Sequence, residues 1–81
     1  MATRELPWYD ICASADTGDT AEAQGIEAAR VAALTLVEDG ATTAAIYPAG
    51  EYGRPAVEHA ARCARTGQPM IHSSDLARSL R

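Results

Sequence analysis

Short apolar segments alternate with segments of helical spacing along this chain. Residues 7–14, 42–47 and 69–72 are rich in β-branched, aromatic or small apolar residues and predict three strands. Residues 20–39 and 55–66 place apolar side chains at helical intervals and predict two helices, with a final helical turn or two near the end of the chain. This alternation predicts an α/β fold with a small three-stranded sheet, mostly parallel, in the order β-α-β-α-β-α.

The length of 81 residues indicates a single domain, residues 1–81, with a small core. Phenylalanine is absent, and alanine supplies much of the apolar content. Association with a second copy would bury more apolar surface, so the sequence favours a homodimer. One alternative to the parallel sheet stays open, in which the first strand doubles back within the acidic loop that follows it and forms an antiparallel edge.

Particular residues indicate where the first predicted helix begins and ends. Asp19 or Thr20 can cap its start, but Gly25 lies within its first turns and indicates that the helix begins later. Asp39-Gly40 supplies the glycine that commonly follows the last helical residue.

Acidic residues are concentrated in the first half of the chain. Residues 1–40 contain eight acidic residues and two arginines, whereas residues 41–81 contain three acidic residues and five arginines. This distribution argues against direct nucleic-acid binding, which needs clustered positive charge, and favours a basic protein partner. A solvated face that only keeps the protein soluble is the alternative. The predicted partner-binding residues are Asp16, Asp19, Glu22 and Glu27, together with the tyrosines Tyr47 and Tyr52.

The start of the sequence, MATRELPWYD, lacks the apolar run of a signal peptide, and no later run is long enough to span a membrane. We therefore expect a cytoplasmic protein that does not associate with membranes. Cys12 and Cys63 are then expected to be reduced, and two cysteines without further ligands do not predict a metal site. No cofactor is predicted.

Residues 47–59, YPAGEYGRPAVEH, form the segment with the clearest chemical potential. Because Pro55 suits the first position of a helix, the segment predicts a glycine-assisted turn that leads into the second helix. The N–H groups at such a helix start, with the charge of an arginine beside them, favour an anion such as a nucleotide phosphate. The residues predicted to hold that ligand are Gly50, Tyr52, Gly53 and Arg54.

The run from Ala44 to Asp75, AAIYPAGEYGRPAVEHAARCARTGQPMIHSSD, resembles a segment of the nucleoside 2-deoxyribosyltransferases. There an apolar strand leads through a glycine loop to a helix that bears a glutamate, then to a glycine, a proline and another strand. The helix glutamate attacks the anomeric carbon of the sugar, and the resemblance implies this role for Glu58. The residues themselves also allow a structural role for Glu58, in the first turn of a helix with Arg62 one turn away.

Two functions follow. The first is a small acidic protein of bacterial or phage type that acts by binding another macromolecule, as an accessory, regulatory or inhibitory factor. The second is a nucleotide- or nucleoside-binding domain that uses residues 50–58. The first is favoured, because the sequence shows no pair of catalytic groups at matching positions.

Overall fold

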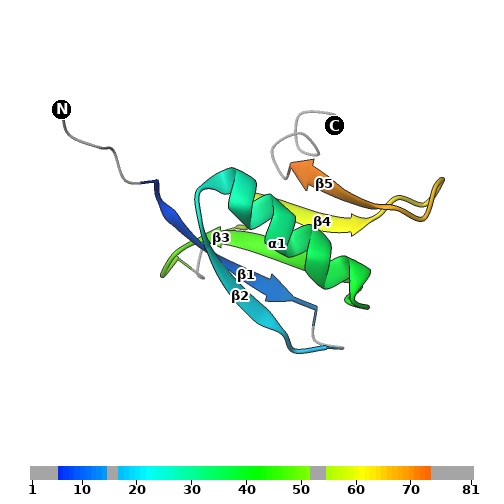
Figure 1. Cartoon of the computed structure of the whole chain (residues 1–81), viewed down its shortest axis with the longest axis horizontal. Coiled ribbons are helices and arrows are strands. Elements are labelled where there is room, and N and C mark those ends of the chain that lie inside the picture. The colour runs from blue at the N-terminus through cyan, green and yellow to red at the C-terminus, as the bar shows by residue number, and fades with distance from the viewer. Residues whose placement is uncertain (1–5, 15–16, 52–54, 74–81) are drawn as a thin grey trace.

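The computed structural model describes residues 6–14, 17–51 and 55–73. It contains one helix, α1, and five strands, β1 to β5, within these residues (Figure 1). In chain order they are β1 Trp8–Ala13, β2 Thr20–Gln24, α1 Ile26–Glu38, β3 Thr43–Pro48, β4 Glu58–Arg62 and β5 Pro69–Ser73.

The five strands form one sheet in the order β2-β1-β3-β4-β5, and every neighbouring pair is antiparallel. The predicted three-stranded, mostly parallel sheet in β-α-β-α-β-α order is therefore wrong. The physical reason lies in the connections: residues 49–57 and 63–68 are too short for the helical crossover that joins parallel strands. The β1–β2 hairpin matches the alternative in which the first strand doubles back.

The predicted positions of three strands are confirmed, because β1, β3 and β5 lie within one or two residues of 7–14, 42–47 and 69–72. The predicted helix at 20–39 is half right. Residues 20–24 form β2, and the helix itself runs over residues 26–38, a later start that agrees with the signal of Gly25. The predicted final helical turns lie outside the described residues.

The second predicted helix, 55–66, is wrong, since residues 58–62 form β4 between β3 and β5. Glu, Ala and Arg favour helices, but only by tenths of a kcal/mol per residue (~0.7 or less). Pairing with a strand on each side outweighs this preference. In the strand, Ala60 packs fully buried against the helical layer, and Arg62 donates to the carbonyl oxygens of Gly67 and Val37.

The helix α1 lies across one face of the sheet (Figure 1). The core lies between them and consists of small side chains, with Ile11, Ile46 and Val37 the largest that are fully buried. The remaining fully buried members of this cluster are the alanines Ala29, Ala33, Ala44 and Ala60. Five strands at ~4.8 Å spacing are about twice as wide as a helix of ~10–12 Å diameter, so a single helix shields only part of the sheet.

Both ends of α1 are set by glycines. Gly25 is the N-cap residue, with φ of 89° and its N–H donated to the carbonyl of Pro7 (2.7 Å). At the other end Gly40 has φ of 125°, its N–H donates to Val37, and the N–H of Ala41 donates to Leu36. These two bonds form a Schellman motif, which confirms the predicted helix end at Asp39-Gly40. Among the described residues, no helix has the length and apolar character needed to cross a membrane.

Candidate binding face

The strands separate their side chains onto two unlike faces, because successive residues of a strand point in opposite directions. On β1, Tyr9 and Ile11 pack with the helix, whereas Trp8, Asp10 and Cys12 point to the other side. We call that other side the open face, because no described helix lies over it (Figure 1). Its side chains are half-buried or exposed: Trp8, Asp10, Cys12, Thr20, Glu22, Gln24, Thr43, Ala45, Tyr47, His59, Ala61, Met70 and His72.

Two acidic residues occupy directly opposite positions of the β1–β2 hairpin. The register pairs Asp10 with Glu22, and both side chains lie on the open face. Like charges in directly opposite positions destabilise an antiparallel strand pair. The register therefore places two negative charges on the same face at neighbouring positions, where a cation could contact both.

A shallow depression of about 290 Å³ lies at this carboxylate pair. Asp10 and Glu22 line it together with Cys12 and Thr20, the next cross-strand pair, and the intervening Ile11 and Ala21. Its acidic rim and open shape suit the cationic end of a long side chain better than a whole small-molecule ligand, since pockets for such ligands enclose most of the ligand.

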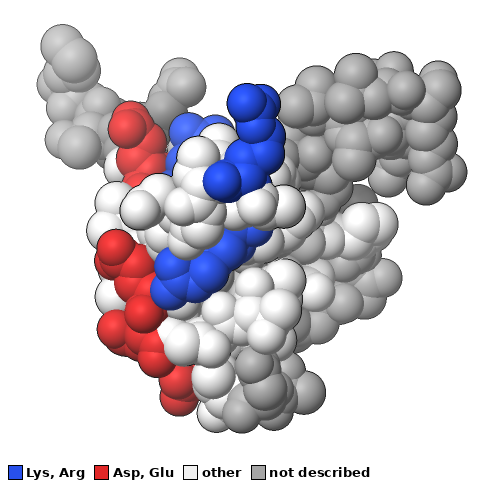
Figure 2. All heavy atoms as spheres, turned by 90° about the vertical axis from the view of Figure 1, so that its right-hand side faces the viewer, with Lys and Arg blue, Asp and Glu red and all other residues white. Residues whose placement is uncertain are grey.

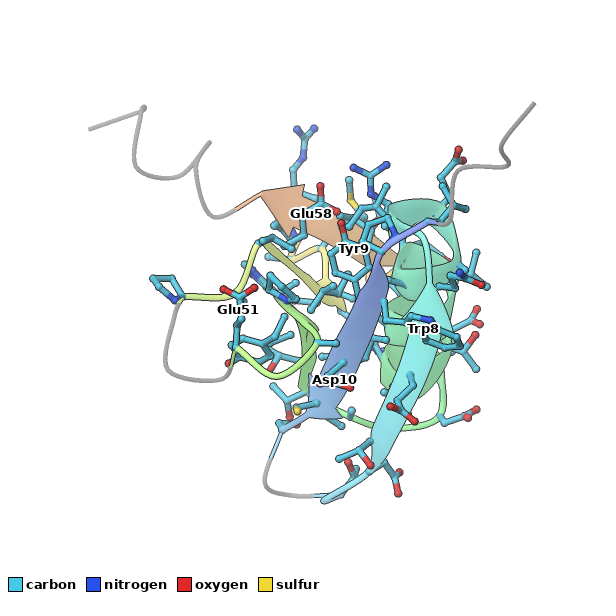
Figure 3. The ribbon with its side chains drawn as sticks, turned by 90° about the vertical axis from the view of Figure 1, so that its left-hand side faces the viewer. Trp8, Tyr9, Asp10, Glu51 and Glu58 are labelled. Carbon is cyan, nitrogen blue, oxygen red and sulfur yellow. The ribbon has the colours of Figure 1, made fainter. Side chains whose placement is uncertain are left out.

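Trp8 supplies an aromatic surface on the same face. It lies two residues before Asp10 on β1, opposite Gln24, and its side chain is 52% exposed. Figure 3 shows Trp8 and Asp10 following one another along β1. Trp8 does not line the depression itself, but an exposed indole two positions from Asp10 offers a guanidinium or ammonium group an aromatic ring on which to stack.

The position of Asp10 is fixed by the connection between β3 and β4. The Gly50 N–H donates to Asp10 Oδ2 (3.2 Å), and the Ala49 N–H donates to the carbonyl of Trp8 (3.0 Å). Gly50 has φ of 77°, a value that glycine adopts without the strain other residues incur. The predicted ligand residue Gly50 thus contacts a carboxylate of the protein itself.

Glu58 lies on the opposite side of the sheet from this depression. It begins β4 and pairs with Arg30 of α1, whose Nε donates to Oε1 (2.7 Å) and Nη2 to Oε2 (2.6 Å). These hydrogen bonds, aided by the charge of Arg30, lower the pKa of Glu58 against the opposing effect of burial. Figure 3 shows Tyr9 near Glu58.

The helical setting predicted for Glu58 is wrong, and so is its pairing with Arg62, because a strand places these residues differently from a helix. The predicted anion site at a helix start has no helix to form it. Both carboxylate oxygens of Glu58 accept hydrogen bonds from Arg30, which accounts for the residue structurally. The likeness to deoxyribosyltransferases stays a prediction.

The predicted partner-binding residues are distributed over both layers. Glu22 is on the open face, Glu27 is in the first turn of α1, and Asp19 is exposed in the β1–β2 connection. Tyr47 is half-buried on β3, directly opposite Asp10. Four predicted site residues lie outside the described residues: Asp16, Tyr52, Gly53 and Arg54. Figure 2 shows acidic side chains along one margin of the molecule, with arginines beside them.

Two members of this face, Trp8 and Asp10, were not assigned to a site from the sequence. The signal is present in the alternation of residues 8–13, WYDICA, which separates Trp8, Asp10 and Cys12 from Tyr9, Ile11 and Ala13. The pairing of Asp10 with Glu22 had no such signal, because it requires residues 20–24 to be a strand.

No family model, curated protein or solved structure matches the chain. Among the described residues, no group of three or more histidine, cysteine or acidic side chains is placed to hold a metal ion. The two cysteines, Cys12 and Cys63, are free.

Proposed function

We propose that the protein acts by binding a basic protein partner, as an accessory, regulatory or inhibitory factor, and that a basic side chain of the partner enters the Asp10–Glu22 depression. The observation that carries the proposal is the direct opposition of these two carboxylates on the open face. An entering cation relieves their repulsion and gains two charge-assisted contacts.

Trp8 adds an apolar and aromatic contact beside the charges. Aromatic residues are enriched at protein interfaces, and a guanidinium group stacks favourably on an indole. Arginine therefore satisfies the site more fully than lysine, because its planar group pairs with carboxylates in two places and stacks as well.

The test uses Trp8 as its own reporter, because it is the one tryptophan in the chain. Short peptides containing arginine are titrated against the protein, and the same peptides with citrulline in place of arginine serve as the neutral control. We expect a saturable change in Trp8 fluorescence with arginine peptides alone, weakened by added salt.

Two double variants with the same change of charge test whether the peptide binds at the Asp10–Glu22 depression. Asp10→Asn with Glu22→Gln removes both charges, while the asparagine oxygen still accepts from the Gly50 N–H. We expect affinity to fall by at least about tenfold, or ~1.4 kcal/mol. The control, Glu38→Gln with Asp39→Asn, makes the same charge change at exposed residues at the end of α1 and should leave affinity unchanged. Equal binding by both variants would overturn the proposal.

A further inference from the structure

The described sheet ends in two edge strands of different character. β2 carries Glu22 at its centre between polar Thr20 and Gln24, and a charge in that position discourages pairing with another strand. The other edge, β5, has the sequence Pro-Met-Ile-His-Ser and contains no acidic or arginine residue. Of the two edges, β5 is the one suited to accept another strand.

Every second residue of β5 directs its backbone hydrogen-bonding groups away from β4, toward the free edge of the described sheet. The Cys63 N–H donates to the Gln68 carbonyl at the closed end of the β4–β5 hairpin (2.8 Å). Bonding and non-bonding positions alternate along an antiparallel pair, so Met70 and His72 direct their backbone groups to β4. Ile71 and Ser73 direct theirs away from it. Pro69 is on the outward side too: its missing N–H weakens no bond with β4, but it leaves the outward edge with one donor fewer.

Apolar side chains flank this edge on both faces of the sheet. On the open face Met70 is 44% exposed, and on the helical side Val31 is 63% exposed. Val31 and Leu34, with Thr35 and Glu38 beside them, line a groove of about 290 Å³ between α1 and the start of β5, where Gln68 and Pro69 form the other side. A strand that pairs with β5 would cover Met70. It would also place its own side chains against the open end of this groove.

We propose that β5 is a homodimerisation edge, at which β5 of a second copy pairs antiparallel about a two-fold axis through Ile71. In this register the Ile71 residues of the two copies exchange both backbone hydrogen bonds, and the Ser73 N–H of each copy donates to the Pro69 carbonyl of the other. Met70 lies opposite His72 of the other copy. The result is a ten-stranded sheet with both helices on one side, Val31 and Leu34 of each copy facing those of the other.

The strand is self-complementary, which is why a second copy is the occupant. A two-fold interface must be satisfied by one surface meeting itself, and a β5 sequence without acidic or arginine residues meets itself without repulsion. The contact surface is modest, because β5 and the groove residues are fewer than the ~20–30 residues per partner of a standard interface. The dimer is accordingly weak and depends on concentration.

Sedimentation velocity and hydrogen exchange of the Ile71 amide, both followed from low micromolar to millimolar protein, test the proposal together. We expect a monomer with a rapidly exchanging Ile71 amide at low concentration, and a dimer with a protected amide at high concentration. A mixture of labelled and unlabelled protein should show contacts between Ile71 residues of different copies.

Two matched variants locate the interface. Met70→Lys puts a charge at the β5 edge and should raise the dimer dissociation constant by at least about tenfold, or ~1.4 kcal/mol. Val57→Lys makes a similar change at a half-exposed residue before β4, 37% exposed, and should leave association unchanged. A monomer at all concentrations, or an Ile71 amide protected equally at all of them because the edge is already covered, would overturn the proposal. Neither readout involves the Asp10–Glu22 depression, so its failure leaves the proposed function standing.

Discussion

Arg30 of α1 and Glu58 of β4 form a bidentate ion pair between the helix and the sheet, although they lie 28 positions apart in the chain. The Glu58 side chain is 15% exposed to solvent, and the Arg30 side chain is 42% exposed. The pair thus has one end close to the core and the other in water, and it fixes the position of the helix on the sheet.

Glu58→Gln should lower the free energy of unfolding by ~1 kcal/mol, because a neutral amide replaces the charged acceptor of two hydrogen bonds. Chemical denaturation measures the change. The control is Glu38→Gln, an exposed glutamate at the end of α1. A loss of equal size in both variants would show that the ion pair contributes nothing specific.

The same carboxylate gives stability a defined pH dependence. Hydrogen bonding from Arg30 lowers the pKa of Glu58 in the folded protein below its ordinary value of 4.5. The unfolded state therefore takes up the proton first as the pH falls. The stabilisation is complete above the ordinary glutamate pKa and is lost as the pH falls through the lower, folded value. Thermal unfolding across this range should show a smaller acid-induced loss for Glu58→Gln than for the parent protein.

Cys63 should react as an activated thiol in the β4–β5 turn. The backbone N–H groups of Arg65 and Thr66, then the Thr66 hydroxyl, lower its pKa below the ordinary value of 9.0 by stabilising the thiolate. Alkylation by iodoacetamide, followed site by site with mass spectrometry over a pH series, measures this pKa. Thr66→Val removes the hydroxyl contribution and should shift the rate profile of Cys63 to higher pH. An unchanged profile would mean that the hydroxyl does not contact the sulfur in solution.

Gly25→Ala should destabilise the fold by ~2 kcal/mol, because φ of 89° with ψ of 148° is a conformation reserved almost entirely for glycine. A Cβ at this position would also lie 2.9 Å from Leu6 Cδ1. Gly18→Ala is the comparison, since Gly18 has φ of 70° but open space around it, and its cost should be nearer ~1 kcal/mol. Melting temperatures of the two variants rank the effects.

The sequence predicted those elements whose local composition and final environment agree. β1, β3 and β5 are short runs of apolar or β-branched residues, and a Schellman glycine marks the end of α1. It failed for residues 20–24 and 58–62, TAEAQ and EHAAR, whose alanines, glutamates and arginine suit a helix. What makes them strands is hydrogen bonding to neighbours in the sheet, which no local pattern contains.

The arrangement of the candidate site could be predicted only in part, for the same reason. Glu22 was predicted as a partner-binding residue from charge alone, but its opposition to Asp10 exists only once β2 is paired with β1. The role given to Glu58 depended on a helix that does not form, and Arg30, its actual partner, lies in a different element. Residues that meet through register or through packing of layers are not adjacent in any sequence pattern.

The strand order β2-β1-β3-β4-β5 divides the chain into two stretches that each pair internally. β1 with β2 is one hairpin, β3 to β5 is a continuous meander, and the β1–β3 ladder is the single strand pairing that joins them. Hairpins close within microseconds because their ends are near in sequence, whereas the joining ladder must bring distant segments together. We therefore expect the pairing of β1 with β3 to be the slow step of folding, and we expect a break in the chain near Gly40 to leave two fragments with matching edges that can reassemble by complementation.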